Sequence, residues 1–325
     1  MNSIGYTHLL AFLLHITSAI LAFMAMPESG LQLGKLVVPE VDYKVITTFN
    51  ETNNMSSTSL QISETDHIVF EDINVVGLIF TNELITALSH LAGVIGFFLF
   101  KDAMMADGRH LESVRRYVEY AITAGLLEVA LLVGMGSDNF YQVLFILLTN
   151  AAIQLMGYMS ERTQDRMRQI YYSIGGFMLL APAITIIVWN ATLVDGMDRV
   201  RELAYFYTAL YLLFGLHNLF DHLFAFWRNS IDRDTGYNIL SVATKIGLSW
   251  LLIAIIFKTY EDAGVVLDPV VDMDFVALQD GLRYGIIGFV VVGLGLTAFV
   301  LPKPGGLPVA ATAAEQQGLM MKTIP

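Results

Sequence analysis

Residues 237–257 read YNILSVATKIGLSWLLIAIIF, and this stretch determines how the rest of the chain has to fold. It is long enough to cross the hydrocarbon core of a bilayer, which takes about 20 mostly apolar residues. Its single charged side chain, Lys245, lies near the middle. The stretch therefore predicts a membrane-spanning helix that carries one lysine at membrane depth.

Working outward, the sequence holds further apolar blocks at residues 4–26, 73–100, 118–136, 140–159, 170–189, 203–227 and 284–301. The composition agrees, because 15% of the 325 residues are charged, against about 25% in soluble domains. We expect an all-α membrane protein in which residues 1–257 form a seven-helix bundle and residues 283–301 form an eighth, C-terminal membrane helix. The first block is also compatible with a cleaved signal peptide, and the last with a peripheral or re-entrant helix.

The distribution of charge predicts the orientation in the membrane. Connections 101–116, 162–168 and 228–233 carry nine of the 18 lysines and arginines, and short loops rich in these residues stay in the cytoplasm. The N-terminus is then cytoplasmic as well. The long connections 27–72 and 258–282 face outward and hold fourteen acidic residues against three lysines. The net charge of −12 is thus a property of the outer face, and no nucleic-acid partner is expected.

Segments outside the helices have patterns of their own. Residues 35–49 and 59–70 are rich in β-branched residues or alternate in polarity, so we expect a small β-hairpin in the first outer loop, 27–72. Residues 258–282 form an acidic outer loop, and the proline- and glycine-containing residues 302–325 form a disordered tail. The chain has no cysteine, which excludes disulfides and cysteine-ligated metals, and we expect no metal site.

Lys245 is the strongest functional signal, because a charge at membrane depth is costly. A lone buried lysine must lose its proton, find a carboxylate or be covalently modified. A desolvated amine is suited to forming a Schiff base with an aldehyde. Ser241 and Ser249 lie one turn away on either side, with Trp250 nearby. An ion pair of purely structural importance explains the same pattern.

Two glutamates in the block 118–136 are candidate partners of this lysine. Glu119, with Thr123 one turn later, lies at the expected cytoplasmic start of the helix. It could equally be a helix-start carboxylate or pair with Arg115 or Arg116. Glu128 is nine residues further on, on the opposite side of the helix and about 13 Å along it, so it is not expected to serve the same pocket.

Other polar and aromatic side chains within the spans have a structural and a functional interpretation. A cluster near the end of the block 203–227 could relay protons, or it could clasp neighbouring helices together. Within that cluster, His217 and Asp221 are one turn apart and could pair. An aromatic stripe in the same block suits helix packing as well as a ligand pocket. The residues are His15, Glu83, His90, Tyr207, Tyr211, Phe214, His217, Asp221 and His222.

Two strings make the sequence specific enough to compare with a known family. Residues 116–120, RYVEY, resemble the counterion motif of the heliorhodopsins, and residues 240–245, LSVATK, followed by Trp250, resemble their retinal-lysine motif. These are retinal proteins whose membrane orientation is inverted relative to type 1 microbial rhodopsins. The resemblance covers residues 6–257. A cytoplasmic N-terminus and a long first outer loop are also what this family would show.

The resemblance implies a set of cofactor contacts. All-trans retinal would be linked to Lys245, with Glu119 as the counterion of the protonated Schiff base. Ser241 and Thr86 would hydrogen-bond around that pair, and a proton-accepting polar cavity would lie on the cytoplasmic side. The remaining residues that it implies are Thr123, Asn150, Ile153, Gly157, Pro182, Phe214, Asn218 and Trp250 at the cofactor, and His15 and His90 in the polar cavity.

Three functional interpretations follow. The first is a light-sensing photoreceptor of heliorhodopsin type that does not pump ions, forms a homodimer in the lipid bilayer and signals to an unidentified cytoplasmic partner. The second is a light-gated or light-driven proton-conducting rhodopsin that uses Glu128 and the cluster of His217, Asp221 and His222. The third is a membrane receptor or scaffold without retinal. Enzyme activity is not expected, because no catalytic triad, metal or phosphate-loop motif is evident.

Overall fold

The computed structural model describes residues 3–26, 36–50, 55–70, 73–193, 198–230 and 232–262. Within these ranges seven helices are long and apolar enough to cross a membrane. Membrane-spanning segments have to be helical because each backbone N–H and C=O then finds its partner within the segment. The long helices are α1 (Ser3–Met24), α2 (Val75–Leu99), α4 (His110–Gly134), α5 (Phe140–Arg162), α6 (Arg166–Leu193), α7 (Asp198–Leu223) and α9 (Arg233–Asp262).

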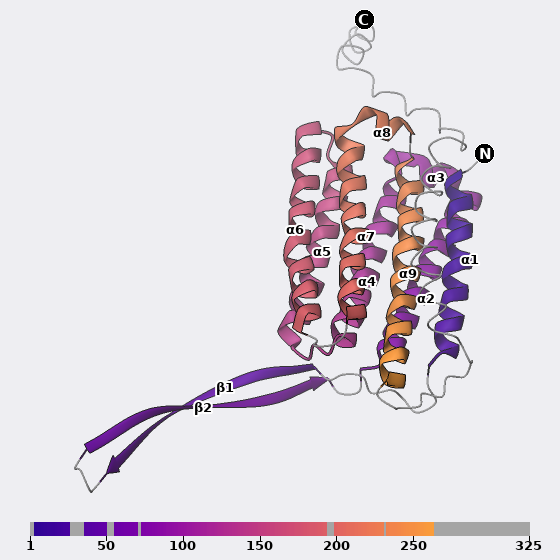
Figure 1. The fold of residues 1–325 in the computed structure, drawn as a ribbon. Coiled ribbons are helices and arrows are strands. Elements are labelled where there is room, and N and C mark those ends of the chain that lie inside the picture. Colours follow the sequence, from indigo (N-terminus) through magenta and orange to yellow (C-terminus); the bar gives the residue numbers. More distant parts are fainter. Residues whose placement is uncertain are drawn as a thin grey trace, which may run out of the picture.

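The seven long helices pack side by side as one bundle (Figure 1). Each contacts the next along the chain, and α9 contacts both α7 and α1, so the helices form a closed ring. Shorter elements join them at one end: α3 (Lys101–Met105), η1 (Ala106–Gly108) and α8 (Ala225–Ser230). This architecture confirms the expected seven-helix membrane bundle.

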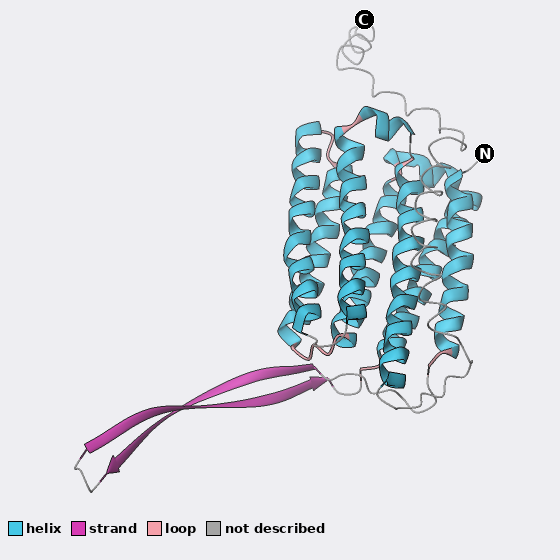
Figure 2. Ribbon diagram, in the orientation of Figure 1, coloured by secondary structure: helices cyan, strands magenta, loops and turns pink. Residues whose placement is uncertain are grey.

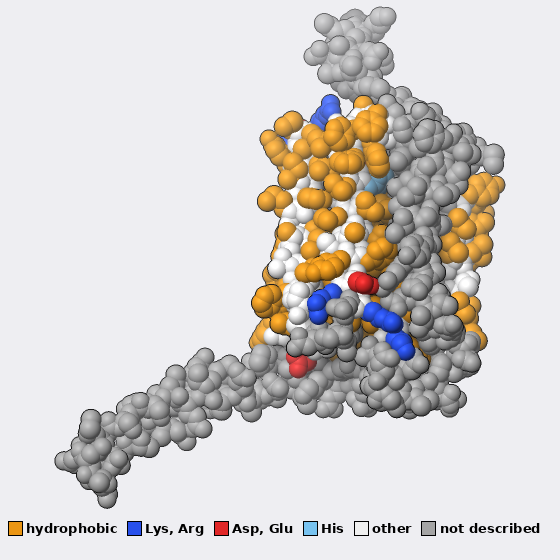
Figure 3. All heavy atoms as spheres, viewed as in Figure 1, with side chains coloured by type: hydrophobic (Ala, Val, Ile, Leu, Met, Phe, Trp, Pro, Cys, Tyr) orange, Lys and Arg blue, Asp and Glu red, His pale blue; other side chains and the backbone are white. Residues whose placement is uncertain are grey.

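The outer wall of the bundle is apolar, as a helix bundle in lipid requires. Leu88, Ile122, Leu148 and Met178, on four different helices, are each more than 45% exposed. Figure 3 shows hydrophobic side chains covering the visible wall between the two ends. This surface faces lipid, which is as apolar as the side chains themselves.

Several helix boundaries differ from the prediction, most of all the start of α4. Helix α4 begins at His110 and not at residue 118, so Glu119 lies about two and a half turns inside the helix and not at its start. Residues 110–117 were left out of the predicted helix because several of them are charged, which is unusual in a membrane span. Glu112 and Arg116 are nevertheless fully buried and ion-paired. At the same end of the bundle, α7 stops at Leu223, and residues 225–230 form the separate helix α8.

Two strands that follow α1 and precede α2 in the sequence form an antiparallel sheet. Strand β1 (Leu36–Asn50) pairs with β2 (Met55–Phe70), from Leu36 opposite Phe70 to Asn50 opposite Met55, with one register irregularity near Leu36. The predicted hairpin had strands within residues 35–49 and 59–70. Figure 2 shows the strands extending away from the bundle. The expected eighth helix at 283–301, most of the loop 258–282 and the tail 302–325 lie outside the described residues.

Candidate functional site

Lys245 is buried inside the bundle and held by three side chains from two other helices. Its Nζ forms an ion pair with the Oε1 of Glu119 on α4. It also donates hydrogen bonds to the Oγ1 of Thr123 at 2.6 Å and of Thr86, on α2, at 3.1 Å. Thr123 in turn donates to the backbone oxygen of Glu119 at 2.9 Å, which is the expected one-turn geometry within a helix. The structure thus brings Glu119, Thr123 and Thr86, three of the predicted cofactor residues, to the amine of Lys245.

The second carboxylate oxygen of Glu119 faces a cation on its own helix. Arg115 Nη1 lies 3.5 Å from Glu119 Oε2 and donates to Ser89 Oγ at 2.5 Å, and Ser89 donates to the same carboxylate oxygen at 3.4 Å. Arg115 is also held in a two-pronged ion pair by Glu112, with bonds of 2.9 and 2.6 Å. Glu119 therefore contacts both Lys245 and Arg115, two of the partners that the sequence offered.

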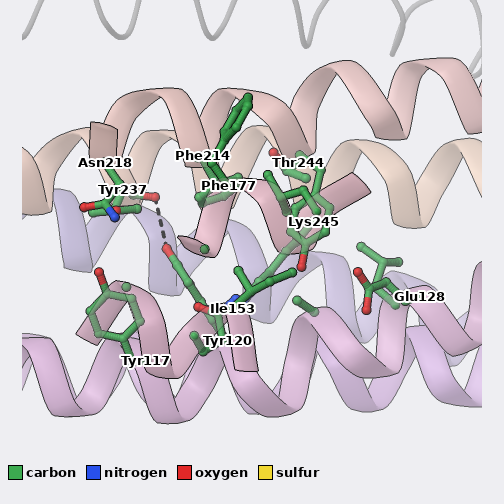
Figure 4. Close-up of a pocket in the computed structure, with 18 of the residues that line it drawn as sticks. Tyr117, Tyr120, Glu128, Ile153, Phe177, Phe214, Asn218, Tyr237, Thr244 and Lys245 are labelled. Atoms are coloured by element: carbon green, nitrogen blue, oxygen red, sulfur yellow. Dashed lines mark hydrogen bonds between the residues drawn. The ribbon is translucent and has the colours of Figure 1, made fainter. Parts of the chain in front are cut away.

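A cavity of about 800 Å³, counting the space at its opening, lies between α4, α5, α6, α7 and α9 with Lys245 on its wall. Its walls are mostly aromatic and aliphatic, and Figure 4 shows Tyr117, Tyr120, Ile153, Phe177 and Phe214 around it. Tyr120 lies with its ring 4.6 Å from Lys245 Nζ and donates through its hydroxyl to the backbone oxygen of Tyr237 at 3.2 Å.

Several residues predicted to contact the cofactor line this cavity. Asn150 lies behind it, where its Oδ1 accepts a hydrogen bond at 2.9 Å from Tyr211, a lining residue. The lining residues among the predicted set are Lys245, Ile153, Gly157, Phe214 and Asn218.

Other predicted residues lie elsewhere. Trp250 donates to Ser18 Oγ on α1 at 2.9 Å and does not line the cavity, because five residues after Lys245 correspond to a rotation of about 140° round the helix. Pro182, inside α6, does not line it either. Ser241 is fully buried, but its Oγ has no hydrogen-bond partner among the described residues, so the bond expected toward Lys245 and Glu119 is not formed.

Sequence reasoning missed the side chains that α4 contributes to the cavity wall, Tyr117 and Tyr120 among them. Tyr117, Tyr120, Ala124, Leu127 and Glu128 all line the cavity from α4. Their spacing of three and four residues marks one helix face, and this signal was available in the sequence. It was obscured because α4 was expected to begin only at residue 118. Glu128 was expected to lie apart from the pocket of Glu119, yet it lines the same cavity as Lys245.

The two histidines of the predicted polar cavity lie close together between α1 and α2. Their rings stack with centroids 5.6 Å apart. His15 Nδ1 lies 2.6 Å from Glu83 Oε2, and His90 Nδ1 lies 2.9 Å from His8 Nδ1. Two members of this polar cluster, His8 and Glu112, were not predicted, and His8 Nε2 lies 3.4 Å from Glu112 Oε1. Because Glu112 also binds Arg115, polar contacts run continuously from this histidine cluster to the Lys245–Glu119 pair.

The cluster near the end of α7 has partners other than those expected. His217 accepts a hydrogen bond from Trp227 Nε1 at 3.1 Å, and its other ring nitrogen lies 3.1 Å from the backbone oxygen of Arg233. Asp221 lies 3.9 Å from the Arg233 guanidinium. The expected pairing of His217 with Asp221 is thus replaced by separate contacts to α8 and α9.

Buried ion pairs tie α4, α5 and α9 together next to the cavity. Arg116 binds both carboxylate oxygens of Glu161, at 2.6 and 2.7 Å, and also binds Asp234. Asp234 further binds Arg109. Burial by itself would lower the pKa of the Arg109 guanidinium, but the Asp234 and Asp232 carboxylates outweigh burial and raise that pKa above its usual value. This network rigidly positions the helix ends at this side of the cavity.

Gly157 allows the ring of Tyr117 to pack directly against α5. A Cβ at this position would lie 2.5 Å from Tyr117 Cε1, so we expect Gly157→Ala to displace the ring and to destabilise the protein by about 1–3 kcal/mol. The matched control is Gly175→Ala, where the nearest atom to an added Cβ is 3.9 Å away. The melting temperature in detergent should fall in the first variant only. Equal melting temperatures for both variants would contradict the close packing of Gly157.

Fold and site together define a class of protein. A seven-helix membrane bundle with one buried lysine, paired to a carboxylate on the wall of an aromatic cavity, is the arrangement of a rhodopsin. The family model for heliorhodopsin matches residues 5–257, and the chain belongs to the heliorhodopsin family. It is accordingly an integral, multi-pass membrane protein of a retinal-binding photoreceptor family.

Comparison with solved structures gives five matching chains. One is the crystal structure of viral rhodopsin OLPVRII, which is 15% identical in sequence with a TM-score of 0.49, and the match covers 79% of this chain and 98% of that one. No curated protein matches the sequence significantly.

Proposed function

We propose that this heliorhodopsin is a light sensor in which all-trans retinal is joined to Lys245 as a Schiff base with Glu119 as its counterion. The observation that carries the proposal is the place of Lys245, whose amine pairs with Glu119 while its side chain lines the large cavity. A buried positive charge on nitrogen needs such a carboxylate to persist. Family membership supports the choice of retinal as ligand.

The residues of the cavity fit such a ligand. The walls are aromatic and aliphatic, as a polyene requires, and Gly157 leaves room for Tyr117 beside them. Thr244 Oγ1 and Asn218 Oδ1 belong to lining residues and are buried without a hydrogen-bond partner among the described residues. Unsatisfied buried polar atoms are uncommon in native proteins and often mark an unfilled contact. We therefore assign them to the ligand pocket.

Each polar residue at Lys245 has a defined task in this proposal. Lys245 would hold the retinal through a C=N bond from its amine nitrogen to the aldehyde carbon, with the aldehyde oxygen released as water. Glu119 stabilises the proton that the nitrogen keeps, and Thr123 and Thr86 fix the direction of the N–H bond. Bound retinal supplies light absorption and isomerisation. Arg115 and Ser89 hold the other oxygen of Glu119, and the cluster of His15 and His90 offers a proton-accepting site.

The expected output is a signal to a cytoplasmic partner, from a homodimer whose N-terminus is cytoplasmic. This orientation follows from the lysines and arginines in the connections 101–116, 162–168 and 228–233. Ion pumping is not expected, because α4 lacks the arrangement of paired carboxylates that is typical of pumps.

A visible absorption spectrum tests the proposal directly. Protein expressed with all-trans retinal should show a visible band that hydroxylamine bleaches in the light. Illumination in a voltage-clamped cell should then give no photocurrent. A folded but colourless protein would contradict retinal binding and favour a receptor or scaffold in which Lys245 forms only an ion pair.

A proton-conducting rhodopsin is the second candidate, favoured by the location of Glu128 on the cavity wall. The cluster at residues 217–222 gives it less support, because His217 and Asp221 are engaged by Trp227 and Arg233. A light-dependent current that Glu128→Gln abolishes would establish this alternative in place of pure sensing.

Glu119→Gln should shift the visible band to longer wavelengths. The carboxylate stabilises the positive nitrogen more in the ground state than in the excited state, because in the excited state this charge moves away along the polyene. Removing the anion therefore narrows the energy gap between the two states. The control is Glu112→Gln, which removes a buried carboxylate that pairs with Arg115 and not with Lys245. We expect a much smaller shift in that variant. Equal shifts in both would contradict the role of Glu119 as counterion.

A further inference from the structure

Glu128 is a second buried carboxyl group at the cavity that holds Lys245. It belongs to α4 and is 1% exposed. Figure 4 shows it on the α4 wall, with Lys245 contributed by α9. Glu119 itself is not among the lining residues. The lysine therefore has one acid paired with its amine and another acid across the cavity.

The contacts of Glu128 differ from those of Glu119. Tyr207 on α7 donates a hydrogen bond of 2.5 Å to Glu128 Oε1, and Glu128 Oε2 is buried without a hydrogen-bond partner among the residues that the structure describes. Glu128 makes no ion pair within the described ranges, whereas Glu119 contacts two cations, Lys245 and Arg115. Tyr211, the neighbour of Tyr207 on the same helix, directs its hydroxyl to Asn150.

These contacts determine which form of each acid is stable. A carboxylate without a cation is strongly disfavoured in a buried site, so the group keeps its proton there. The Tyr207 hydroxyl then donates to the carbonyl oxygen Oε1, and Oε2 carries the proton. Two carboxyls whose surroundings differ in this way take different roles, one charged and one neutral.

Among the described residues, Lys245 is the only positively charged group on the cavity wall. The titratable lining residues besides Glu128 are Lys245, Tyr117, Tyr120, Tyr207, Tyr211 and Tyr237. Arg116 lies behind the rings of Tyr117 and Tyr237, at 5.1 and 4.4 Å, and is already paired with Glu161 and Asp234. A negative charge on Glu128 would therefore act chiefly on the Lys245 nitrogen, across a medium of low dielectric constant.

We propose that Glu128 is a latent second counterion of Lys245, neutral while Glu119 is charged and ionised when Glu119 is neutralised or the medium becomes alkaline. On ionisation the O–H bond of Glu128 breaks and the proton passes to water or hydroxide of the medium. The new carboxylate stabilises the ground-state charge on the nitrogen and moves the visible band to shorter wavelengths. This inference rests on the proposed retinal linkage, and it adds a residue that sets the colour and its pH response.

The protonation of Glu128 is measurable without retinal. The infrared spectrum of the retinal-free protein should contain a carbonyl band of a protonated carboxylic acid that disappears in Glu128→Gln and persists in Glu112→Gln, which leaves the Lys245–Glu119 pair in place. In Tyr207→Phe the band should move to higher wavenumber, because the hydrogen bond to Oε1 is lost. A spectrum from which Glu128→Gln removes no such band would overturn the proposal, whether or not the protein binds retinal.

The counterion role is tested in the retinal-bound protein, in chloride-free sulfate buffer so that no small halide replaces a carboxylate. Glu119→Gln and Glu128→Gln should each keep a visible band at neutral pH. The double variant should lose it to a near-ultraviolet band, since neither acid is left to hold the proton on the nitrogen. The alkaline shift to shorter wavelengths should occur in the native protein and be absent in Glu128→Gln.

The outcomes separate this inference from the proposed function. If the double variant keeps the visible band of Glu119→Gln unchanged, Glu128 is not a counterion, although Lys245 still carries the retinal. If no variant is coloured, the retinal linkage itself fails, while the infrared band still reports whether Glu128 carries a proton. Should Glu128→Gln fold poorly, Glu128→Asp keeps the acid and should retain both the carbonyl band and the alkaline shift.

Discussion

Lys245→Ala should give a folded protein without any visible absorption. The expected effect is complete, because Lys245 is the only lysine among the described residues that line the cavity and a methyl group cannot form a C=N bond. The change also leaves Glu119 without its main partner at a side-chain exposure of 2%. Removing one member of a buried ion pair lowers the free energy of unfolding by roughly 3–5 kcal/mol if the other member stays charged. We therefore expect a lower melting temperature that the added change Glu119→Gln partly restores.

Two control variants separate loss of the linkage from loss of the fold. Lys245→Arg keeps a cation beside Glu119 but cannot form a Schiff base, so it should be colourless and more stable than Lys245→Ala. Lys101→Ala alters an exposed lysine on α3 and should keep the native colour. A visible band in either Lys245 variant, measured after removal of free retinal, would show that the cofactor is attached elsewhere.

The fold could be predicted well because the bilayer restricts the alternatives. Hydropathy located all seven helices of the bundle, and the resemblance in residues 116–120 and 240–245 indicated the family that the family model over residues 5–257 confirms. The start of α4 was misplaced because its first turns look like a loop. Arg116 satisfies its charge with partners far away in the sequence, on α5 and α9. Glu112 contacts His8 on α1 in addition to Arg115 on its own helix. Local composition cannot reveal such pairs.

The candidate site was predictable where spacing within one helix sufficed. Glu119 and Thr123 are one turn apart, and a lone lysine at membrane depth is conspicuous in any sequence. The arrangement across helices was harder to foresee. Trp250 lies close to Lys245 in sequence yet contacts α1, whereas Glu128, which seemed to be on the wrong side of α4, reaches the cavity wall. Which side chains meet there depends on how five helices rotate against one another.

Arg116→Met should be the most destabilising change outside the retinal linkage. Arg116 has no exposed side-chain surface and is paired with Glu161 and Asp234. Its guanidinium also lies 4.4 Å from the ring centre of Tyr237. Replacing it with methionine leaves two buried carboxylates with fewer cations, which lowers the free energy of unfolding by roughly 3–5 kcal/mol. The melting temperature of the detergent-solubilised protein should fall by several degrees or more.

Arg168→Met is the matched control, since it removes the same type of side chain from an exposed pair. Arg168 and Asp165 are 3.5 Å apart with side-chain exposures of 70% and 53%, and such surface pairs contribute about 0–1 kcal/mol. If both variants melt at the same temperature, the network of Arg116 is not a structural support. If the melting temperature falls more in Arg116→Met than in both Arg168→Met and Arg233→Met, the ion pairs of Arg116 themselves stabilise the protein. Because Tyr117 and Tyr237 lie between Arg116 and the cavity, such a loss should be accompanied by a changed absorption maximum.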